Sequence, residues 1–600
     1  MSLSSSDHPP EAEYRRRLDR HRALEATQAR EDRRVANARI AVFLAAGILI
    51  WCSLQWQPVW LWWLFAPLAL FVCLVIAHER IKWARQRTQH AIAYYERGLA
   101  RLADQWPGKG PSGSRFIDEN HPYAADLDIF GAGSLFERLC TAQTRKGEET
   151  LAAWLSAAAP AAEVRARQEA VLELRPRLDF REDLAAVGDS QLTGLDPAAL
   201  AVWGTTAPVL TSPWQYLAMN AAVLLTIAAL LSWWAFATGF APFVAALLVE
   251  ILVAVRFSAR ARRVLDAVEK AAKDLQLFAN LLARLEREPV KSERLTTLYA
   301  ALHTEGTPPS RRLWQLKRLI DWLNADRNQL FAPLAALLLW RTRFAMALDS
   351  WRARYGPAIA GWLNVVGEYE ALCALATYSY ENPLDPFPEV AEKGPLFEAE
   401  GIGHPLIPVG RSVRNDLRLG GELRVLVVSG SNMSGKSTLL RTVGSNTVLA
   451  LAGAPVRARK LRLSPLSVGA TLRVQDSLQA GRSRFYAEIT RLRQLVDLAK
   501  GQVPLLFLLD EILHGTNSHD RRHGAEAVVR GLVNMGAIGL ITTHDLALAE
   551  IAERLAPRAA NVHFEDEFVN GAITFDYHMR PGVTRHSNAL ALMRAVGLDV

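Results

Sequence analysis

The sequence predicts an α/β P-loop domain at the C-terminus, preceded by an α-helical core and two transmembrane helical hairpins. A glycine-rich loop follows a short apolar run that contains β-branched residues, and later apolar runs end in carboxylates or a histidine. Upstream, long apolar segments occur as two tandem pairs. The length of 600 residues allows three or four domains, and 50% hydrophobic residues is the average expected of a membrane region and a soluble region together.

The glycine-rich loop spans residues 430–438 and follows the predicted strand 425–428. In such a loop, backbone N–H groups and the first turn of the next helix surround a polyanion, because glycines leave no Cβ in the way. We expect Lys436 to reach the β and γ phosphates of ATP and the Ser437 hydroxyl to ligate Mg²⁺. A glycine turn without a ligand is the alternative for the bare pattern. The predicted nucleotide-binding residues of the loop are Gly430, Ser431, Asn432, Met433, Ser434, Gly435, Lys436, Ser437 and Thr438.

Two further apolar runs place chemistry-bearing residues at strand ends. The continuous run 505–509 is typical of a fully buried parallel strand, and it ends in Asp510 and Glu511. Asp510 is suited to holding Mg²⁺, and Glu511 to polarising the attacking water. The run 538–543 also has the pattern of a buried strand, and His544 directly follows it. We expect His544 to contact the γ phosphate. An acidic surface turn and a capping histidine are the simpler alternatives.

These motifs resemble the MutS-type ATPases, a family related to the ABC ATPases and known for DNA mismatch repair. The dipeptide Asn432-Met433 inside the loop is typical of that family. Residues 510–520 resemble its D-E-I-G-R-G-T-S-T-x-D segment, with departures at 513 and 514. Residues 476–488 resemble its signature loop, and residues 134–171 and 276–390 resemble, more faintly, its helical core and lever.

The resemblance implies an ATP hydrolase with ATP and Mg²⁺ as cofactors. It implies that Lys436, Glu511 and His544 are catalytic and that Ser437 and Asp510 ligate the metal. In the signature loop, Ser483 and Gly481, together with Asp520, are implied to act on the nucleotide of the opposite subunit, which makes a homodimer the expected assembly. Tyr577, which follows a hairpin predicted to turn at 570–571, is implied to stack on adenine.

DNA binding is also implied by the family, but the residues that read mismatches have no counterpart here. No segment before the core resembles the family's Phe-x-Glu wedge. The run Phe485-Tyr486-Ala487-Glu488 belongs to the signature loop and does not replace that wedge. Mismatch specificity is therefore doubtful.

The predicted transmembrane hairpins are formed by four apolar runs. Runs 40–56 and 59–77 are separated only by Gln57-Pro58, and runs 216–237 and 240–255 only by Thr238-Gly239. Their length and layout are typical of helical hairpins that cross a lipid bilayer, and pairs of buried soluble helices are the alternative. Glu250 lies within the last run, where a carboxylate indicates either a functional site or pairing with a neighbouring helix.

Arginines flank both hairpins on the same side. Nine Arg precede Ile40, clusters follow the hairpins at 80–87 and 256–263, and the short inter-helix turns carry no Lys or Arg. This asymmetry predicts a multi-pass protein of a bacterial-type inner (plasma) membrane with its ATPase domain in the cytoplasm. The net charge of +8 fits this bias and contact with anionic lipid better than it fits nucleic acid.

The function predicted from the sequence is a membrane-anchored MutS-like ATPase that couples ATP binding and hydrolysis in a dimer to motion of its levers and hairpins. One alternative is an ATPase that remodels a membrane or a membrane-protein partner without DNA, and another is a nucleotide-gated scaffold with negligible hydrolysis. The predicted domains are a basic cytoplasmic arm (1–39), a first transmembrane hairpin (40–78), a first α-helical core segment (79–211), a second transmembrane hairpin (212–256), a second core segment with the lever (257–390) and the ATPase domain (391–600).

Overall fold

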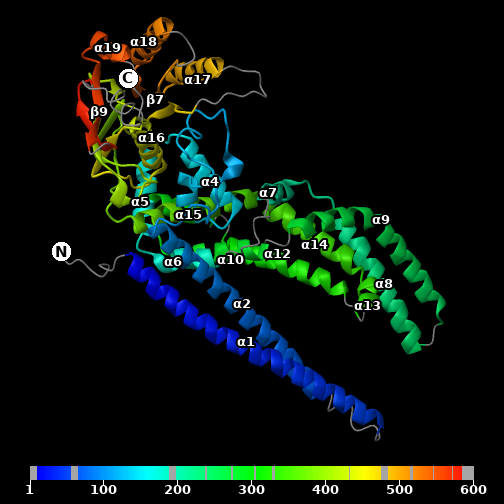
Figure 1. Cartoon of the computed structure of the whole chain (residues 1–600). Coiled ribbons are helices and arrows are strands. Elements are labelled where there is room, and N and C mark those ends of the chain that lie inside the picture. Colours follow the sequence, from blue (N-terminus) through cyan, green and yellow to red (C-terminus); the bar gives the residue numbers. More distant parts are fainter. Residues whose placement is uncertain are drawn as a thin grey trace.

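In the computed structural model, helices fill the N-terminal region and mixed α/β sheets form the C-terminal region, as the sequence predicts. Figure 1 shows two long helical arms that leave a central helical body, with the α/β region at the opposite end of that body. The structure describes residues 10–55, 65–187, 197–236, 239–271, 275–302, 306–327, 331–431, 433–473, 484–513, 518–544, 546–569 and 572–583.

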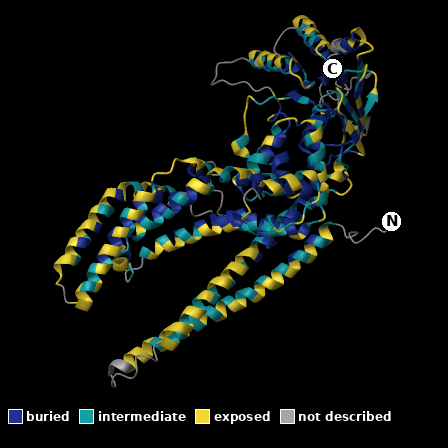
Figure 2. Ribbon diagram, turned by 180° about the vertical axis from the view of Figure 1, so that it is seen from behind, coloured by how far each residue is buried: buried dark blue, intermediate teal, exposed yellow. Residues whose placement is uncertain are grey.

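The two arms are helical hairpins. The first contains α1 (Pro10–Gln55) and α2 (Phe65–Leu102), and the second contains α8 (Pro213–Phe236) and α9 (Ala241–Ala271). From residue 10 to residue 55, the part that the structure describes, the predicted basic arm and the first apolar run lie in α1 with no break between them. The described parts of both arms extend away from the α/β region (Figure 1 and Figure 2).

The outer portions of the arms are largely exposed, as the yellow ribbon in Figure 2 shows, and their exposed residues include many large apolar ones. Within the described residues, α1, α8 and α9 are each long and apolar enough to cross a membrane, whereas the predicted run 59–77 begins outside those residues. In the most apolar stretch of α1 no residue is buried, and in those of α8 and α9 only 22% and 17% are. Exposed apolar surface of this extent is unfavourable in water and is typical of segments that contact lipid or another protein.

The body is organised around α15 (Ile359–Glu381), whose residues are buried on nearly all sides. A helix that is apolar all round belongs in a core, and α15 packs on α4, α5 and α11. Residues 104–120 are irregular chain with one short 3-10 turn at Ser114–Phe116. The other helices of the body are α3 (Leu135–Leu139), α4 (Arg145–Ser156), α5 (Ala161–Leu174), α6 (Leu178–Val187), α7 (Pro197–Thr205), α10 (Leu275–Leu285), α11 (Glu293–Leu302), α12 (Pro309–Leu323), α13 (Ala332–Leu337) and α14 (Trp340–Tyr355).

The larger sheet has the strand order β10-β9-β4-β8-β7-β6, in which all neighbours are parallel except β10 and β9. The strands predicted at 425–428, 505–509 and 538–543 are confirmed, and so is the terminal hairpin, whose turn at 570–571 lies outside the described residues. The strands are β4 (Val425–Ser429), β6 (Ser467–Thr471), β7 (Leu505–Asp510), β8 (Ile538–Thr543), β9 (Ala559–Val569) and β10 (Ala572–Pro581).

A second, smaller sheet was not anticipated from the sequence. Its order is β1-β5-β2-β3, and its strands alternate between buried and exposed positions as a half-covered sheet does. The chain between β2 and β3 runs past the glycine-rich loop. The strands are β1 (Glu389–Val390), β2 (Leu396–Ile402), β3 (Asn415–Gly420) and β5 (Lys460–Leu463).

Helices cover both faces of the larger sheet. Helix α16 (Lys436–Ala452) packs on one face with Leu426 and Val428, and the opposite face, with Val425 and Val427, meets the remaining three helices. Every residue of β4 is buried, so the loop that follows it starts from a fixed point. The three helices are α17 (Arg484–Ala499), α18 (Ser518–Asn534) and α19 (Leu546–Arg554).

A buried ion pair joins the first arm to the end of α15. Arg101 donates from Nε and Nη2 to the Glu381 carboxylate at 2.8 and 2.7 Å, and the Tyr14 hydroxyl donates to the same carboxylate at 3.2 Å. All three side chains are buried. Both helices of the arm are therefore tied to the last turn of α15.

A second set of polar contacts joins the residues that follow α15 to α16. The Asn446 amide donates to the Gly403 carbonyl at 3.0 Å and accepts from the Arg457 backbone N–H at 2.8 Å. The Arg457 guanidinium donates to Asn382 Oδ1 at 3.1 Å and pairs with Asp385 at 3.1 Å. Asn446 thus connects α16, the β2–β3 segment and the residues that follow α15.

Candidate functional site

The glycine-rich loop leaves the buried end of β4 and enters α16. Gly430 and Gly435 have φ of 149° and 100°, backbone conformations that side chains disfavour. A Cβ on Gly430 would lie 2.9 Å from the Ser434 hydroxyl, so the loop closes tightly on itself. Lys436 Nζ donates to the carbonyls of Gly430 and Ser431 at 2.9 and 2.8 Å, and its ammonium group is thereby held against the loop.

Lys436 is only 5% exposed. Burial lowers the pKa of Lys436, while the nearby charges of Glu511 and Asp510 act to raise it. A partly desolvated cation beside two carboxylates is poised to exchange its loop contacts for an anionic ligand.

Asp510 ends β7 and Glu511 follows it, and one residue of the neighbouring strand contacts both. The Thr542 hydroxyl donates to Asp510 Oδ1 and accepts from the Glu511 backbone N–H at 3.2 Å. Glu511 itself has a positive φ of 48°. A single threonine therefore fixes the Asp510 carboxylate and the start of the turn that presents Glu511.

His544 contacts Glu511 in the structure. Its Nδ1 lies 3.0 Å from Glu511 Oε1, and both side chains are partly exposed. The sequence predicted that this imidazole contacts the γ phosphate, and that role stays a prediction. The observed contact gives the imidazole a second role, because it orients the carboxylate.

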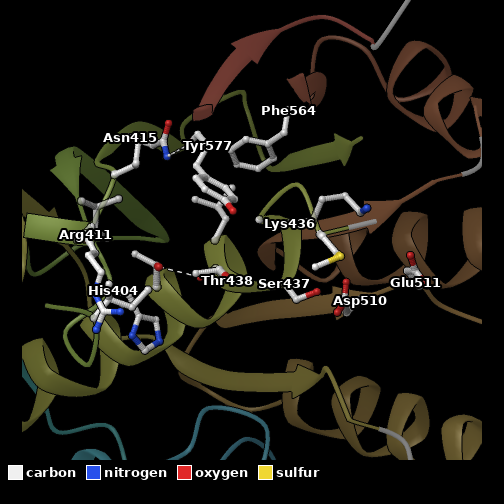
Figure 3. A pocket seen from close by; sticks show the side chains of 18 residues that line it. His404, Arg411, Asn415, Lys436, Ser437, Thr438, Asp510, Glu511, Phe564 and Tyr577 are labelled. Carbon is white, nitrogen blue, oxygen red and sulfur yellow. Dashed lines mark hydrogen bonds between the residues drawn. The ribbon is translucent and has the colours of Figure 1, made fainter. Parts of the chain in front are cut away.

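The loop, the carboxylates and the β2–β3 segment enclose a pocket of about 610 Å³, which Figure 3 shows from close by. Tyr577 lies on one side of Lys436 in this view, and Asp510 and Glu511 lie on the other, with Ser437 pointing toward Asp510. The lining residues include Ile402, His404, Ile407, Arg411, Asn415, Met433, Gly435, Lys436, Ser437, Thr438, Asp510, Glu511, Phe564 and Tyr577.

Tyr577 covers the start of α16. A Cβ built on Gly435 would lie 3.0 Å from Tyr577 Cδ1, so the ring rests on the glycine. Asn415 clamps this stretch of β10, since its amide donates to the Tyr577 carbonyl at 3.0 Å and its Oδ1 accepts from the Met579 N–H at 2.7 Å. The ring is 42% exposed, which leaves some of it open to a ligand.

We expect Tyr577→Ala to weaken ATP binding about tenfold, because stacking of a base on an aromatic ring is worth about 1–3 kcal/mol. Tyr577→Phe keeps the ring and should bind ATP as the unchanged protein does. Equilibrium titration with ATP and with inorganic triphosphate separates the base from the phosphates, and only ATP should respond to the alanine. Equal ATP affinities of the alanine and phenylalanine variants would rule out stacking.

The β2–β3 segment adds His404 and Arg411 to the pocket wall. Burial, reinforced by the charge of Arg441, lowers the pKa of His404 to about 4, so its imidazole is neutral at physiological pH. Arg411 is exposed and supplies a cation at the rim. Sequence reasoning gave no site role to Arg411 or Thr542, because both reach the site only through sheet geometry.

Several residues predicted for the site cannot be placed. Asn432, Gly481 and Ser483 lie outside the described residues, and their roles stay predictions. Asp520 lies in α18, exposed and beside His519 at 3.6 Å. Glu488, the last residue of the predicted signature loop, lies in α17, where it accepts a hydrogen bond from the Leu513 N–H and so ties α17 to the turn after β7.

The site offers partners for a nucleotide and its metal. The hydroxyls of Ser431 and Ser434 are buried without a hydrogen-bond partner among the described residues, as expected of a loop that has donors to spare for an anion. The described residues contain no group of three or more His, Cys, Asp or Glu side chains that could hold a metal by themselves. Such a site suits Mg²⁺, which binds through one carboxylate, a hydroxyl and substrate phosphates.

Comparison with known proteins agrees with this geometry. The family model of MutS domain V matches residues 426–599. The chain is 34% identical over 242 residues to the DNA mismatch repair protein MutS of Natronomonas pharaonis and 33% over 233 residues to the DNA mismatch repair protein MutS 2 of Halobacterium salinarum. It is 34% identical over 207 residues to the endonuclease MutS2 of Thermus thermophilus.

These matches show that the C-terminal part of the chain is similar to MutS domain V. They cover 39%, 38% and 34% of this chain and 27%, 26% and 27% of the respective relatives. The chain thus spans about a quarter of the length of the curated relatives that it matches.

Proposed function

We propose that this protein is a membrane-anchored ATP hydrolase that works as a dimer and uses ATP to move its helical arms. The observation that carries the proposal is the convergence of Lys436, Asp510 and Glu511 on one pocket at the start of α16. The match to MutS domain V covers all three residues.

Each residue has a role that follows from its position. The loop N–H groups and Lys436 bind the phosphates, and Tyr577 covers the base. Ser437 and Asp510 would hold Mg²⁺, which supplies positive charge between the β and γ phosphates when it is bound. Glu511 orients the attacking water and takes its proton, and His544, 3.0 Å away, positions that carboxylate.

Dimerisation belongs to the proposal through the predicted signature loop. If Ser483 acts on the nucleotide of a second subunit, ATP draws two chains together and hydrolysis releases them. The contacts of Asn446 and Arg457 connect α16 to the end of α15, and Glu381 connects that end to the first arm. Closure at the nucleotide is thereby coupled to the position of the arms.

Anchoring in the bilayer rests on the exposed apolar surfaces of α1, α8 and α9 and on the arginine asymmetry around them. The proposed location is the plasma membrane of a bacterial-type cell, with the α/β region in the cytoplasm. In a variant with Cys52→Ala and Cys73→Ala, a cysteine at Phe240 should react with a membrane-impermeant thiol reagent outside intact cells. A cysteine at Ser258 should react only after lysis, and its labelling in intact cells would overturn this topology.

DNA binding is a second candidate function, because two of the relatives are named DNA mismatch repair proteins and the third an endonuclease. The detergent-purified protein can be titrated with duplex DNA at several salt concentrations, with and without ATP. ATP turnover without salt-dependent DNA binding favours a membrane-remodelling ATPase. DNA binding that responds to ATP favours the mismatch-repair-related function, and the absence of turnover contradicts the ATPase itself.

A further inference from the structure

The helical pair α12 and α14 ends in an apolar tip beside the second arm (Figure 1). This lever tip, defined as residues 322–327 and 331–340, contains ten consecutive apolar residues at 331–340. Among its described residues, Trp322 and Leu334 are 51% and 49% exposed. These two side chains present apolar surface to the solvent at the end of a lever, as membrane and partner contacts do.

The described portion of the lever tip is internally packed. The indole of Trp340 stacks on that of Trp322 at 6.1 Å between centroids and donates from Nε1 to the Trp322 carbonyl at 2.8 Å. Phe331 meets Trp340 edge-on at 5.0 Å, and Phe344 lies 4.7 Å from Trp340 on the other side. The exposed side chains are therefore held by a packed aromatic cluster.

Contacts between α14 and α8 determine how far along the second arm the lever tip lies. The Tyr216 hydroxyl donates to the Met346 carbonyl at 3.0 Å, and Arg343 donates to the Asn220 side chain. Because α14 runs antiparallel to α8, Trp340 lies about 9 Å further toward the end of the arm than Met346, from six residues at about 1.5 Å each.

The same region is where the apolar portion of the second arm begins. The apolar run of α8 starts at Tyr216, and that of α9 ends at Val255, followed by Arg256. Trp214 and Phe257 meet there, with centroids 5.7 Å apart. If α8 and α9 cross a bilayer, the lever tip extends about 9 Å past this boundary. Interfacial helices bury their apolar faces to a depth of about 5–10 Å.

The charges around the lever tip match an anionic surface. Residues 309–343 contain seven Lys or Arg and two Asp. The Arg341 side chain is 71% exposed, although its guanidinium lies 3.6 Å from Asp326. Long cationic side chains can keep their charge at the headgroups while an apolar neighbour enters the acyl region.

We propose that the lever tip docks into the cytoplasmic leaflet of an anionic bilayer as a third membrane contact, one that enters the leaflet without crossing it. This inference rests on the proposed anchoring by α8 and α9. In this arrangement the lever tip lies in lipid in addition to the two hairpins. Motion of the lever therefore acts directly on the cytoplasmic leaflet.

Environment-sensitive labels on the full chain in vesicles test this inference. The vesicles contain phosphatidylglycerol and phosphatidylcholine, and the chain carries Cys52→Ala and Cys73→Ala, since both cysteines are exposed, whereas Cys140 and Cys373 are buried. A single cysteine at Leu334 carries an NBD label. Leu225 of α8, 53% exposed, is the control for the anchor, and Leu172 of α5, 49% exposed, is the matched control for water.

The Leu334 label should emit at shorter wavelength than the Leu172 label, lose intensity to doxyl lipids and resist iodide. A label at Ala336, which is also exposed, should repeat the result and guards against a local effect of one substitution. A Leu334 label that behaves like Leu172 while Leu225 is quenched by lipid overturns the inference and leaves the anchor intact. If the Leu225 label also fails to respond to lipid, the anchoring is wrong, and the inference fails with it. A Leu334 label shielded from both quenchers is covered by protein, such as a second copy, and this also overturns the inference.

Discussion

Glu511→Gln should retain ATP binding and lose steady-state turnover by about 10²–10⁴-fold, the usual contribution of a general base. The amide cannot take the proton of the attacking water, whereas Asp510 and the loop, which hold metal and phosphates in the proposed site, are unchanged. Turnover is measured as phosphate release at saturating ATP and Mg²⁺, and binding by equilibrium titration.

Lys436→Ala provides the contrasting variant, because it should weaken ATP binding itself. Glu553→Gln is the matched control, an exposed glutamate on α19 outside the pocket, and it should keep both properties. Turnover of Glu511→Gln equal to that of Glu553→Gln would show that another group activates the water.

Glu381→Ala should destabilise the protein by about 3–5 kcal/mol, because it leaves the buried Arg101 guanidinium without its carboxylate. The change is measured as the shift of the thermal unfolding midpoint in detergent. Combining Glu381→Leu with Arg101→Met removes both charges and should recover most of the loss.

Glu398→Ala serves as the surface control for this experiment. Its pair with Arg462 is exposed and spans 3.7 Å, so its removal should cost about 0–1 kcal/mol. If Glu381→Ala shifts the midpoint no more than Glu398→Ala does, the contact between the first arm and α15 contributes little to stability.

The features that were predictable from the sequence depend on local signals. The run 505–509 is apolar throughout because β7 is covered on both faces. The glycines and the lysine of residues 430–438 identify the phosphate-binding type of loop. The smaller sheet gave no comparable signal, since β1 has two residues and β5 has four. Its placement beside the loop depends on contacts between distant segments of the chain.

The sequence predicted which residues form the candidate site, but it did not predict the contacts between them. Asp510 and Thr542 meet because β7 and β8 pair in one particular register, and no local pattern encodes that register. The contact between His544 and Glu511 likewise depends on two strand ends that lie side by side. The helix α1 was divided into an arm and an apolar run because its charge changes near residue 39, although the backbone continues as one helix.

The buried amide of Asn446 limits where this molecule can bend. It holds the Gly403 carbonyl and the Arg457 N–H at 3.0 and 2.8 Å, and losing either contact would leave a polar group unsatisfied in the core. Helix α16, the wall of the pocket at 403 and the chain after α15 must therefore move as one rigid unit. In the proposed nucleotide cycle, any hinge therefore lies outside this unit.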